Sequence, residues 1–248
     1  MLAREDRDGV AWLRIDRPER RNALPAAFWG RLREVTAALA ADREVRAAVL
    51  HGAGGCFSVG ADIDDFPAAE GAEARRRFLV EATTALEELA ALPKPVLAAV
   101  HGHCIGGGLE LTLACDLVVA DRTARFAAPE ARVGLVPGVL LAWGRERIGD
   151  HWLRHLALSG EPLGAEEARQ AGLVNFVVPA GEHLERAAGL AGKLAAGAPL
   201  AQAVVKATLA RPGLGGAVES GTLLQGSEDF AEGRAAFRER RAPRFSGR

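Results

Sequence analysis

Short apolar runs alternate with amphipathic stretches along the first half of the chain. Residues 10–15 alternate well enough for a strand, whereas 47–50, 96–100 and 117–120 are almost wholly apolar and are typical of buried strands. Apolar residues recur at helical spacing over 25–41, and 70–91 predicts a long helix that ends before Pro93. Strands that alternate with helices predict an α/β fold with much parallel pairing.

Helical patterns dominate the second half of the chain from about residue 139. Short strands are expected at 124–127 and 173–178, and a helical tail follows Pro199. We therefore expect two parts, a core over 1–195 and a C-terminal helical region over 196–248. The second part would cover the site or mediate assembly.

Composition and charge narrow the class of protein. The chain has 248 residues, 49% of them hydrophobic, and a formal net charge of −1. These values are typical of a globular protein and give no sign of a nucleic-acid or membrane partner. The three cysteines are too few for a disulfide framework, and no leader or membrane-length apolar run is visible. A reducing cytoplasm fits best.

Three consecutive glycines, Gly106-Gly-Gly108, lie between a predicted buried strand and a predicted short helix over 108–115. Glycine weakens a helix, so the run needs a reason. Either it lets the turn pack closely, or it bares backbone N–H groups at a helix start, where negative charge is favoured. A phosphate or an oxyanion would suit such a site.

Glu110 favours the oxyanion over the phosphate. It follows Gly107 by three residues and so lies on about the same helix face. A carboxylate there would repel phosphate, but it could serve a carbonyl whose oxygen becomes negative only during reaction. Alone, Glu110 is also explained as an exposed acid in a first helical turn.

Two further segments could complete such a site. Gly60 permits a tight turn in the loop 57–63, which would leave the N–H of Ala61 as a second donor, although the loop is also explained by an ordinary turn at Asp62. Pro129 stiffens the backbone before Glu130, whose carboxylate would then be held in place. Glu130 is equally explained as a helix-start residue after proline.

Six segments in order carry a family resemblance: Arg17-Pro-Glu-Arg-Arg-Asn-Ala-Leu24, Phe57-Ser-Val-Gly-Ala-Asp-Ile63, residues 94–111 with Cys115-Asp116, 126–138, 165–174, and 227–237 with 240–248. Together they resemble the crotonase family of enoyl-CoA hydratases and isomerases. The resemblance implies a spiral of ββα units, with a C-terminal helical region that assembles homotrimers, or dimers of trimers. It implies an acyl-CoA thioester substrate and no metal or other cofactor.

The resemblance also implies residue roles. Ala61 and Gly107 would donate N–H groups to the thioester oxygen, and the two glutamates of hydratases match Glu110 and Glu130. Glu110 would help to activate water, and Glu130 would deliver a proton to the carbon next to the thioester. Residues expected to bind the substrate or its CoA are Arg20, Arg21, Ala23, Ala61, Asp62, Ile63, Gly138 and Arg240, the last by reaching a neighbouring subunit's CoA.

One segment departs from the family pattern. Hydratases continue after the Pro-Gly pair with a small, polar, glycine-rich stretch, whereas Gly138 is followed by Val139-Leu-Leu-Ala-Trp143. We expect this bulk to reshape the acyl pocket or to squeeze out the water. Reversible hydration of a 2-enoyl-CoA remains the leading interpretation, with isomerisation second and acyl-CoA binding without turnover third.

Residues of these segments also suggest two other kinds of site. Cys56-Phe-Ser-Val-Gly60 nearly matches the nucleophile elbow of serine hydrolases but lacks its first glycine. His101, His103 and Cys104 crowd together as a metal site would, but no fourth ligand follows at a usual spacing.

Overall fold

The computed structural model describes residues 1–65, 71–210 and 214–248, without the side chains of 214–217. Its centre is a sheet with the strand order β1-β2-β3-β4-β6-β9, in which β1 is antiparallel and the other strands are parallel. These strands are β1 (Leu2–Arg7), β2 (Val10–Ile15), β3 (Ala47–Gly52), β4 (Val96–Val100), β6 (Leu117–Asp121) and β9 (Phe176–Val178). The mixed α/β architecture agrees with the predicted class.

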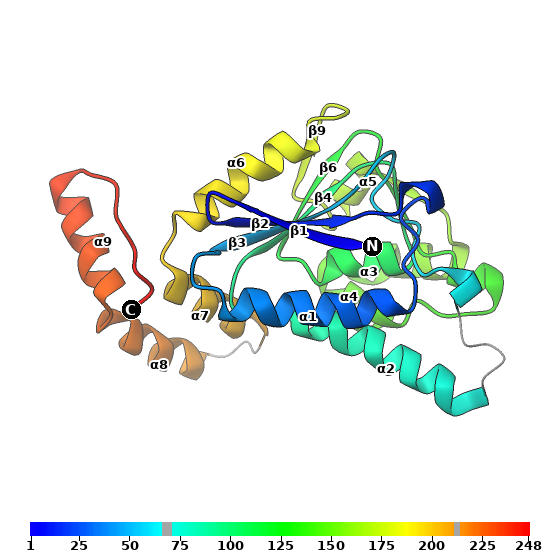
Figure 1. Cartoon of the computed structure of the whole chain (residues 1–248), viewed down its shortest axis with the longest axis horizontal. Coiled ribbons are helices and arrows are strands. Elements are labelled where there is room, and N and C mark those ends of the chain that lie inside the picture. The colour runs from blue at the N-terminus through cyan, green and yellow to red at the C-terminus, as the bar shows by residue number, and fades with distance from the viewer. Residues whose placement is uncertain (66–70, 211–213) are drawn as a thin grey trace.

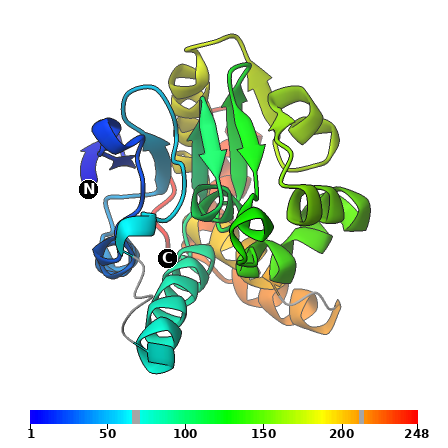
Figure 2. The same ribbon diagram turned by 90° about the vertical axis from the view of Figure 1, so that its right-hand side faces the viewer.

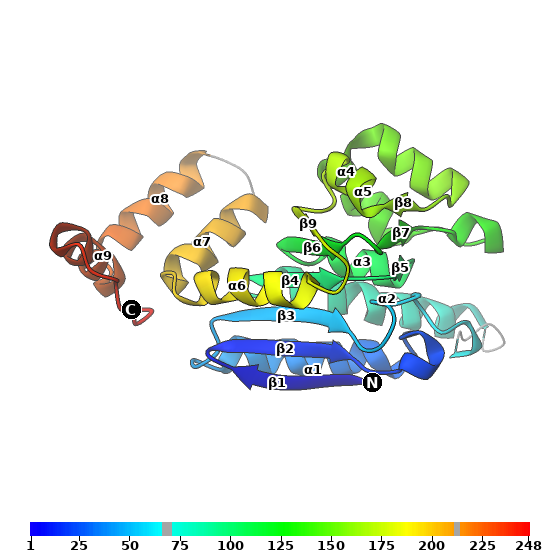
Figure 3. The same cartoon turned by 90° about the horizontal axis from the view of Figure 1, so that it is seen from above.

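Helices cover both faces of this sheet (Figures 1 and 3). The helices are α1 (Ala27–Ala41), α2 (Gly71–Ala90), α3 (Gly107–Leu113), α4 (Gly138–Arg154), α5 (Ala165–Gln170), α6 (His183–Ala195), α7 (Pro199–Ala210), α8 (Leu214–Gln225) and α9 (Glu228–Glu239). Short turns of 3-10 helix are η1 (Pro18–Arg20), η2 (Ile63–Asp65) and η3 (Glu130–Val133), and a π-helical turn, η4 (His155–Ser159), follows α4.

The continuous apolar runs of the central strands are explained by burial on two sides. Alternate residues such as Val49, Leu97 and Val119 pack against α6 on one face. Their neighbours in sequence, such as Leu50 and Ala98, join the larger core under α1, α2 and α3 on the other face. Because successive strand side chains point to opposite faces, a strand covered on both sides needs no polar positions.

Some sequence-based boundaries needed correction. The charged segment 2–7, where the apolar pattern predicts no strand, is the edge strand β1, in which Leu2 alone is buried and the charged side chains face water. The strand expected at 173–178 is shorter, since only Phe176–Val178 pairs with β6, while Leu173 and Val174 are buried in the preceding turn. Pairing along an exposed edge depends on backbone partners, which apolar periodicity does not report.

A second, small sheet lies at the end of the molecule that faces the viewer in Figure 2. It consists of β5 (His103–Ile105), β7 (Arg125–Ala127) and β8 (Leu163–Gly164), in the order β5-β7-β8. The glycine run follows β5 directly and leads into α3, and α3 packs against α4. This arrangement brings segments 57–61, 103–110 and 127–140 together.

The C-terminal helices α7, α8 and α9 extend away from the sheet, on the side opposite α3 and α4 (Figures 1 and 3). Lys206 of α7 holds this region to the core, since its Nζ donates to the Lys94 carbonyl at 2.9 Å and to the Asp116 carboxylate at 2.6 Å. The expected division between 195 and 196 falls between α6 and α7. In the described residues no single helix is long and apolar enough to cross a membrane; α6 and α7 pass that test only as a pair bent by 107°.

Candidate active site

The glycine run makes a sharp turn that no other residue type would tolerate at its first position. Gly106 has φ 54° and ψ −121°, and its N–H donates to the Ala127 carbonyl at 2.9 Å. A Cβ on Gly106 would lie 2.7 Å from Oε1 of Glu130. Glycine is therefore required twice here, once for the positive φ and once for the carboxylate beside it. The helix after the turn begins at Gly107, one residue earlier than expected.

Ala61 and Gly107 lie side by side although they come from different loops. A Cβ on Gly107 would lie 3.6 Å from the Ala61 nitrogen, and a Cβ on Gly60 would lie 3.1 Å from the Gly107 nitrogen. Leu24 pairs with both neighbours of Ala61, because Leu24 N donates to the Gly60 carbonyl and Asp62 N donates to the Leu24 carbonyl, each at 2.8 Å. This pairing turns the Ala61 N–H away from Leu24.

Neither the Ala61 N–H nor the Gly107 N–H donates a hydrogen bond to another described residue. Two adjacent unpaired donors, one of them at the first position of a helix, form a favourable site for a negatively charged oxygen. The geometry is that expected of an oxyanion hole.

Ser58 fastens the two loops together. Its backbone exchanges hydrogen bonds with β5, from Ser58 N to the His103 carbonyl at 2.9 Å and from Ile105 N to the Ser58 carbonyl at 3.0 Å. Its fully buried hydroxyl donates to the Asn22 carbonyl at 2.8 Å and accepts from Gly60 N at 3.1 Å. A hydroxyl so engaged and enclosed is structural, which argues against the serine-hydrolase interpretation.

Glu110 projects from the first turn of α3 to the start of α4. Its Oε1 accepts from Val139 N at 2.9 Å and from Leu140 N at 3.2 Å, so the side chain caps α4, whose own N-cap residue makes no side-chain cap. Burial raises the pKa of Glu110 above its usual value, while the two N–H donors oppose the shift by stabilising the ionised form. The helix start therefore favours a carboxylate at this position.

Glu130 stands at the first position of η3, beside the glycine run. Its Oε2 is buried and has no hydrogen-bond partner among the described residues. Burial is the main cause of its raised pKa; its own backbone N–H opposes the shift, and the charge of Glu110 adds to it. An unpaired buried carboxyl beside another carboxylate favours the protonated form. The two glutamates thus share one site but meet unlike surroundings.

The bulky segment after Gly138 is directed mainly into the core. Val139 is 7% exposed and Leu140 is fully buried, and the ring of Trp143 also packs against the main core. Leu141 is 47% exposed. The expectation that this bulk reshapes the acyl pocket or squeezes out the water stays a prediction, although the side chains of Val139, Leu140 and Trp143 pack mainly against the core. Val139 and Leu140 also donate the backbone N–H groups that hold Glu110.

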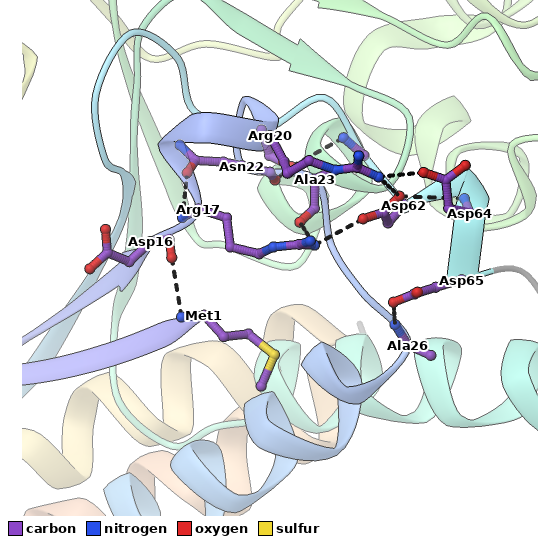
Figure 4. Close-up of polar contacts among 12 residues, drawn as sticks. Met1, Asp16, Arg17, Arg20, Asn22, Ala23, Ala26, Asp62, Asp64 and Asp65 are labelled. Carbon is purple, nitrogen blue, oxygen red and sulfur yellow. Dashed lines mark hydrogen bonds and ion pairs between the residues drawn. The ribbon is translucent and has the colours of Figure 1, made fainter.

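Several residues expected at the CoA hold the loops in place in the folded chain (Figure 4). Asp62 is only 6% exposed and pairs with Arg17 and Arg20, both at 3.0 Å. Burial alone would raise the pKa of Asp62, but the guanidinium groups of Arg20 and Arg17 hold it below its usual value. Arg20 also pairs with Asp64 at 2.5 Å, so a phosphate would have to share its guanidinium.

The remaining residues expected to bind the substrate lie on different elements and differ in exposure. Ala23 is nearly buried, and its carbonyl accepts from Arg17 at 3.0 Å, whereas Ile63 is 74% exposed in η2. Arg21 is exposed with φ 50°, and Gly138 starts α4 with open space where a Cβ would be. Arg240 is the C-cap residue of α9. Within one chain, α9 lies remote from α3 (Figures 1 and 3).

Arg17 and Asn22 support the site in ways that sequence reasoning missed. Asn22 is fully buried with φ 57°; its Nδ2 donates to the Ala53 and Cys56 carbonyls at 2.8 and 2.7 Å, and its Oδ1 accepts from Arg17 N at 3.0 Å. The available signal in the sequence was Asn22 itself, an uncharged polar residue directly after the charged residues 19–21. Its partners became visible only in the folded chain.

The cysteines and histidines of this region do not form a metal centre within the described residues, where no group of three or more suitable ligands is found. Cys56, Cys104 and Cys115 are free and buried. Nε2 of His101 lies 2.8 Å from the Gly54 carbonyl, and His103 is exposed on β5. Loop packing accounts for them.

The chain resembles known proteins along almost its whole length. A family model described as Enoyl-CoA hydratase/isomerase matches residues 5–248. The 2,3-dehydroadipyl-CoA hydratase of Escherichia coli is 36% identical, with 100% of this chain and 98% of that protein covered. The mitochondrial enoyl-CoA hydratase domain-containing protein 2 of Bos taurus is also 36% identical, with coverage of 96% and 85%.

Solved structures show the same likeness. The enoyl-CoA hydratase of Bacillus anthracis superposes with a TM-score of 0.95 at 29% identity, covering 100% of this chain and 99% of that one. The enoyl-CoA hydratase of Mycobacterium smegmatis superposes with a TM-score of 0.91 at 32% identity, covering 98% of each chain. The spiral fold expected from the sequence is therefore confirmed.

Proposed function

Since the chain belongs to the enoyl-CoA hydratase/isomerase family, we propose that it catalyses the reversible addition of water to the double bond of a 2-enoyl-CoA thioester. One observation carries this proposal. Two glutamates lie beside a pair of unpaired N–H donors; burial raises the pKa of both, but two N–H donors from α4 oppose the shift at Glu110, whereas Oε2 of Glu130 has no partner among the described residues. A base and an acid next to an oxyanion site are what water addition requires.

In this proposal Glu110 accepts a proton from water as the water oxygen bonds to C3 of the enoyl group. The C2–C3 π electrons move toward the thioester, and the carbonyl oxygen becomes negative between the N–H groups of Ala61 and Gly107. Glu130 then gives its proton to C2 and the carbonyl re-forms. After the product leaves, proton exchange through solvent restores Glu110 as a base and Glu130 as an acid.

The magnitudes explain why both devices would be needed. One oxyanion donor lowers the activation barrier by about 3 to 4 kcal/mol. A positioned acid or base contributes about 10²- to 10⁴-fold in rate. Neither alone reaches the roughly 10⁶-fold at which enzymatic acceleration usually begins.

Apolar side chains near the candidate site bear on the acyl group of the substrate. One relative bears the name of a dehydroadipyl-CoA hydratase, whose substrate carries a second carboxylate. Exposed apolar side chains follow both catalytic segments here, Leu135 and Val136 after Glu130 and Leu141 in the helix capped by Glu110. They support an apolar acyl group more than a charged one.

The direct test is loss of enoyl-thioester absorbance when enzyme is added to a panel of 2-enoyl-CoA substrates of increasing length. We expect hydration of at least one of them, identified by the 3-hydroxyacyl-CoA product. Glu130→Gln should lower kcat by about 10²- to 10⁴-fold and leave CoA affinity nearly unchanged. If no member of the panel is hydrated, or if Glu130→Gln retains near-normal turnover, the proposal is wrong.

Isomerisation of a 3-enoyl-CoA is the second candidate, and the engagement of Glu110 favours it. Oε1 of Glu110 already accepts two N–H donors, so Glu130 alone could move a proton between C2 and C4. Glu110→Gln separates the two reactions, because glutamine keeps an oxygen that can cap α4 but is no longer a base. We expect about 10²-fold slower hydration.

Two measurements complete that comparison. If Glu110→Gln spares turnover of a 3-enoyl-CoA and the wild-type chain hydrates little, isomerase is the better assignment. Glu110→Ala, which loses the cap as well, serves as the structural reference, since only this variant should also lower Tm.

A further inference from the structure

Trp29 is a buried aromatic residue of α1 for which the proposed mechanism has no role. Its side chain is 3% exposed and belongs to the main core, where it meets Phe28 edge to face with ring centroids 5.3 Å apart. α1 follows directly on the loop that contains Arg17 and Asn22. The ring therefore extends from the core toward the candidate oxyanion hole.

The space beside Gly107 would accept a methyl group, which would have three nearest neighbours. A Cβ placed on Gly107 would lie 3.6 Å from the Ala61 nitrogen, 3.6 Å from Leu24 Cδ1 and 3.7 Å from Trp29 Cη2. All three are ordinary van der Waals distances, so nothing in the described chain fills this space. One boundary is an oxyanion donor, and another is the edge of the indole ring.

The dimensions of a thioester decide what would meet that edge. An oxygen bound by both N–H groups lies about 2.9 Å from each nitrogen. Its carbonyl carbon is about 1.2 Å farther on, and C2 follows after about 1.5 Å more. C2 would thus lie two bonds beyond an oxygen whose two donors border the space that Leu24 and Trp29 enclose.

We propose that Trp29 is a specificity-determining residue, whose ring edge excludes acyl groups that carry a substituent at C2. This inference rests on the proposed function, because it needs the thioester oxygen to lie between Ala61 and Gly107. Unbranched 2-enoyl-CoA substrates fit beside the ring, whereas a methyl group at C2 competes with it for the same space.

The indole nitrogen supports a role for the shape of the ring. Nε1 of Trp29 is buried and has no hydrogen-bond partner among the described residues. An unpaired buried N–H destabilises a fold, and a leucine at the same core position would carry no such penalty. What tryptophan adds here is the reach of its six-membered ring.

The test compares but-2-enoyl-CoA with its 2-methyl derivative, 2-methylbut-2-enoyl-CoA. For the wild-type chain we expect kcat/KM to be at least 10-fold lower with the methylated substrate, since one methylene in an apolar pocket changes discrimination by about 10- to 200-fold. Trp29→Leu should reduce this discrimination at least 10-fold, and Trp29→Phe should fall between the two. Equal kcat/KM for both substrates in the wild-type chain would overturn the proposal.

A binding measurement keeps this proposal separate from the proposed function. Butyryl-CoA and 2-methylpropanoyl-CoA are saturated and need no turnover, and free CoA is the common reference. The wild-type chain should bind the unbranched compound more tightly, and Trp29→Leu should remove the difference while free CoA binds unchanged. If no enoyl-CoA is hydrated but this pattern holds, only the catalytic assignment fails.

Two results would argue against the exclusion of C2 substituents by the Trp29 ring. If Trp29→Leu weakens both saturated thioesters equally while Tm is unchanged, the ring supports the pocket without selecting the acyl group. If Trp29→Phe removes the difference between the two saturated thioesters as completely as Trp29→Leu does, the N–H, and not the ring edge, is the contact. Trp152→Phe, a change at the partly buried ring that meets His155, is the matched control and should alter neither ratio.

Discussion

Glu110 and Glu130 are the same amino acid, and their different surroundings suit them to different tasks. Glu110 accepts two backbone N–H donors from the start of α4. Glu130 has a buried oxygen with no partner and lies near a like charge. Hydrogen bonds to a carboxylate favour its ionised form, whereas burial and a second negative charge favour the acid. Burial raises the pKa of both glutamates, and the proposed division into base and acid rests on the two N–H donors from α4 that oppose this shift at Glu110 alone.

Glu130 should reduce the stability of the fold at neutral pH. Because its folded-state pKa is raised, the folded chain holds a proton over a pH range in which the unfolded chain has lost it, so stability falls as pH rises through that range. Glu130→Gln removes this loss. We expect the variant to have a higher Tm than the wild-type chain at pH 8, with the difference shrinking toward pH 5; 1 kcal/mol corresponds to about 2–4 °C.

Thermal unfolding followed by circular dichroism measures this effect. Glu146→Gln, at an exposed position of α4, is the control and should show no such trend. A Tm difference that stays constant from pH 5 to pH 8 would contradict the buried charge as its cause.

Gly107 offers a test of the oxyanion site with little risk to the fold. A methyl group there meets nothing closer than 3.6 Å, yet it would lie beside the candidate oxyanion site, 3.6 Å from the Ala61 nitrogen. We expect Gly107→Ala to lower kcat by about 10²-fold, comparable to the loss of one oxyanion donor, with Tm nearly unchanged. Gly108→Ala is the contrast, because its Cβ would lie 2.8 Å from the Ser58 carbonyl and should lower Tm as well. Normal turnover by Gly107→Ala would place the thioester elsewhere.

At the scale of elements, the site depends on how loops are held to one another. Ser58 joins the loop of Ala61 to β5, and Asn22 joins the Arg17–Ala23 segment to the loop after β3. Asp62 and Arg20, expected from the resemblance to contact CoA, also pair with each other. A residue can contribute to CoA binding by shaping the loop, without touching the ligand.

Asn22→Ala should destabilise the whole chain. It removes a fully buried side chain that makes three hydrogen bonds and leaves their partners buried, which costs about 2–4 kcal/mol. We expect that loss in urea unfolding, together with a higher KM for acyl-CoA. Asn22→Gly keeps the positive φ accessible and so isolates the hydrogen bonds. If Asn22→Gly were as stable as the wild-type chain, the backbone conformation alone would explain the residue.

At the scale of the whole molecule, the sheet supplies a rigid frame while the C-terminal helices lie apart from it (Figure 1). Large apolar side chains on these helices face water within a single chain: Val205 (57%), Leu209 (76%), Val218 (68%), Leu223 (79%) and Phe237 (86%). So much apolar surface is typical of an interface between subunits. We propose that this region assembles the homotrimer expected from the resemblance, in which Arg240 would approach a neighbour's CoA.

Phe237→Asp tests that assembly. A charge in an apolar interface carries a large desolvation cost, so the assembled species should dissociate toward monomers at micromolar concentration. Analytical ultracentrifugation measures the shift, and Phe237→Leu, which stays apolar, should remain assembled. If the wild-type chain itself sediments as a monomer, the proposal of a trimer is wrong.

Much of the architecture was predictable because it depends on local pattern. The apolar runs at 47–50, 96–100 and 117–120 became β3, β4 and β6, and the glycine run became the start of α3. β1 was missed because its charged side chains carry no apolar period, although its backbone pairs along all of β2. The burial of Val139 and Leu140 could not be read from the sequence, because a helix start does not reveal which of its faces meets the core.

The sequence by itself determined the α/β class, the family resemblance and the identity of the candidate groups, since these depend on residue types and spacing along the chain. The tertiary structure alone decided that Glu110 caps α4, that Glu130 keeps an unpaired oxygen, and that Trp29 lies next to Gly107. Hydrogen bonding, burial and van der Waals contact act between neighbours in space, and the neighbours of these residues come from distant parts of the chain.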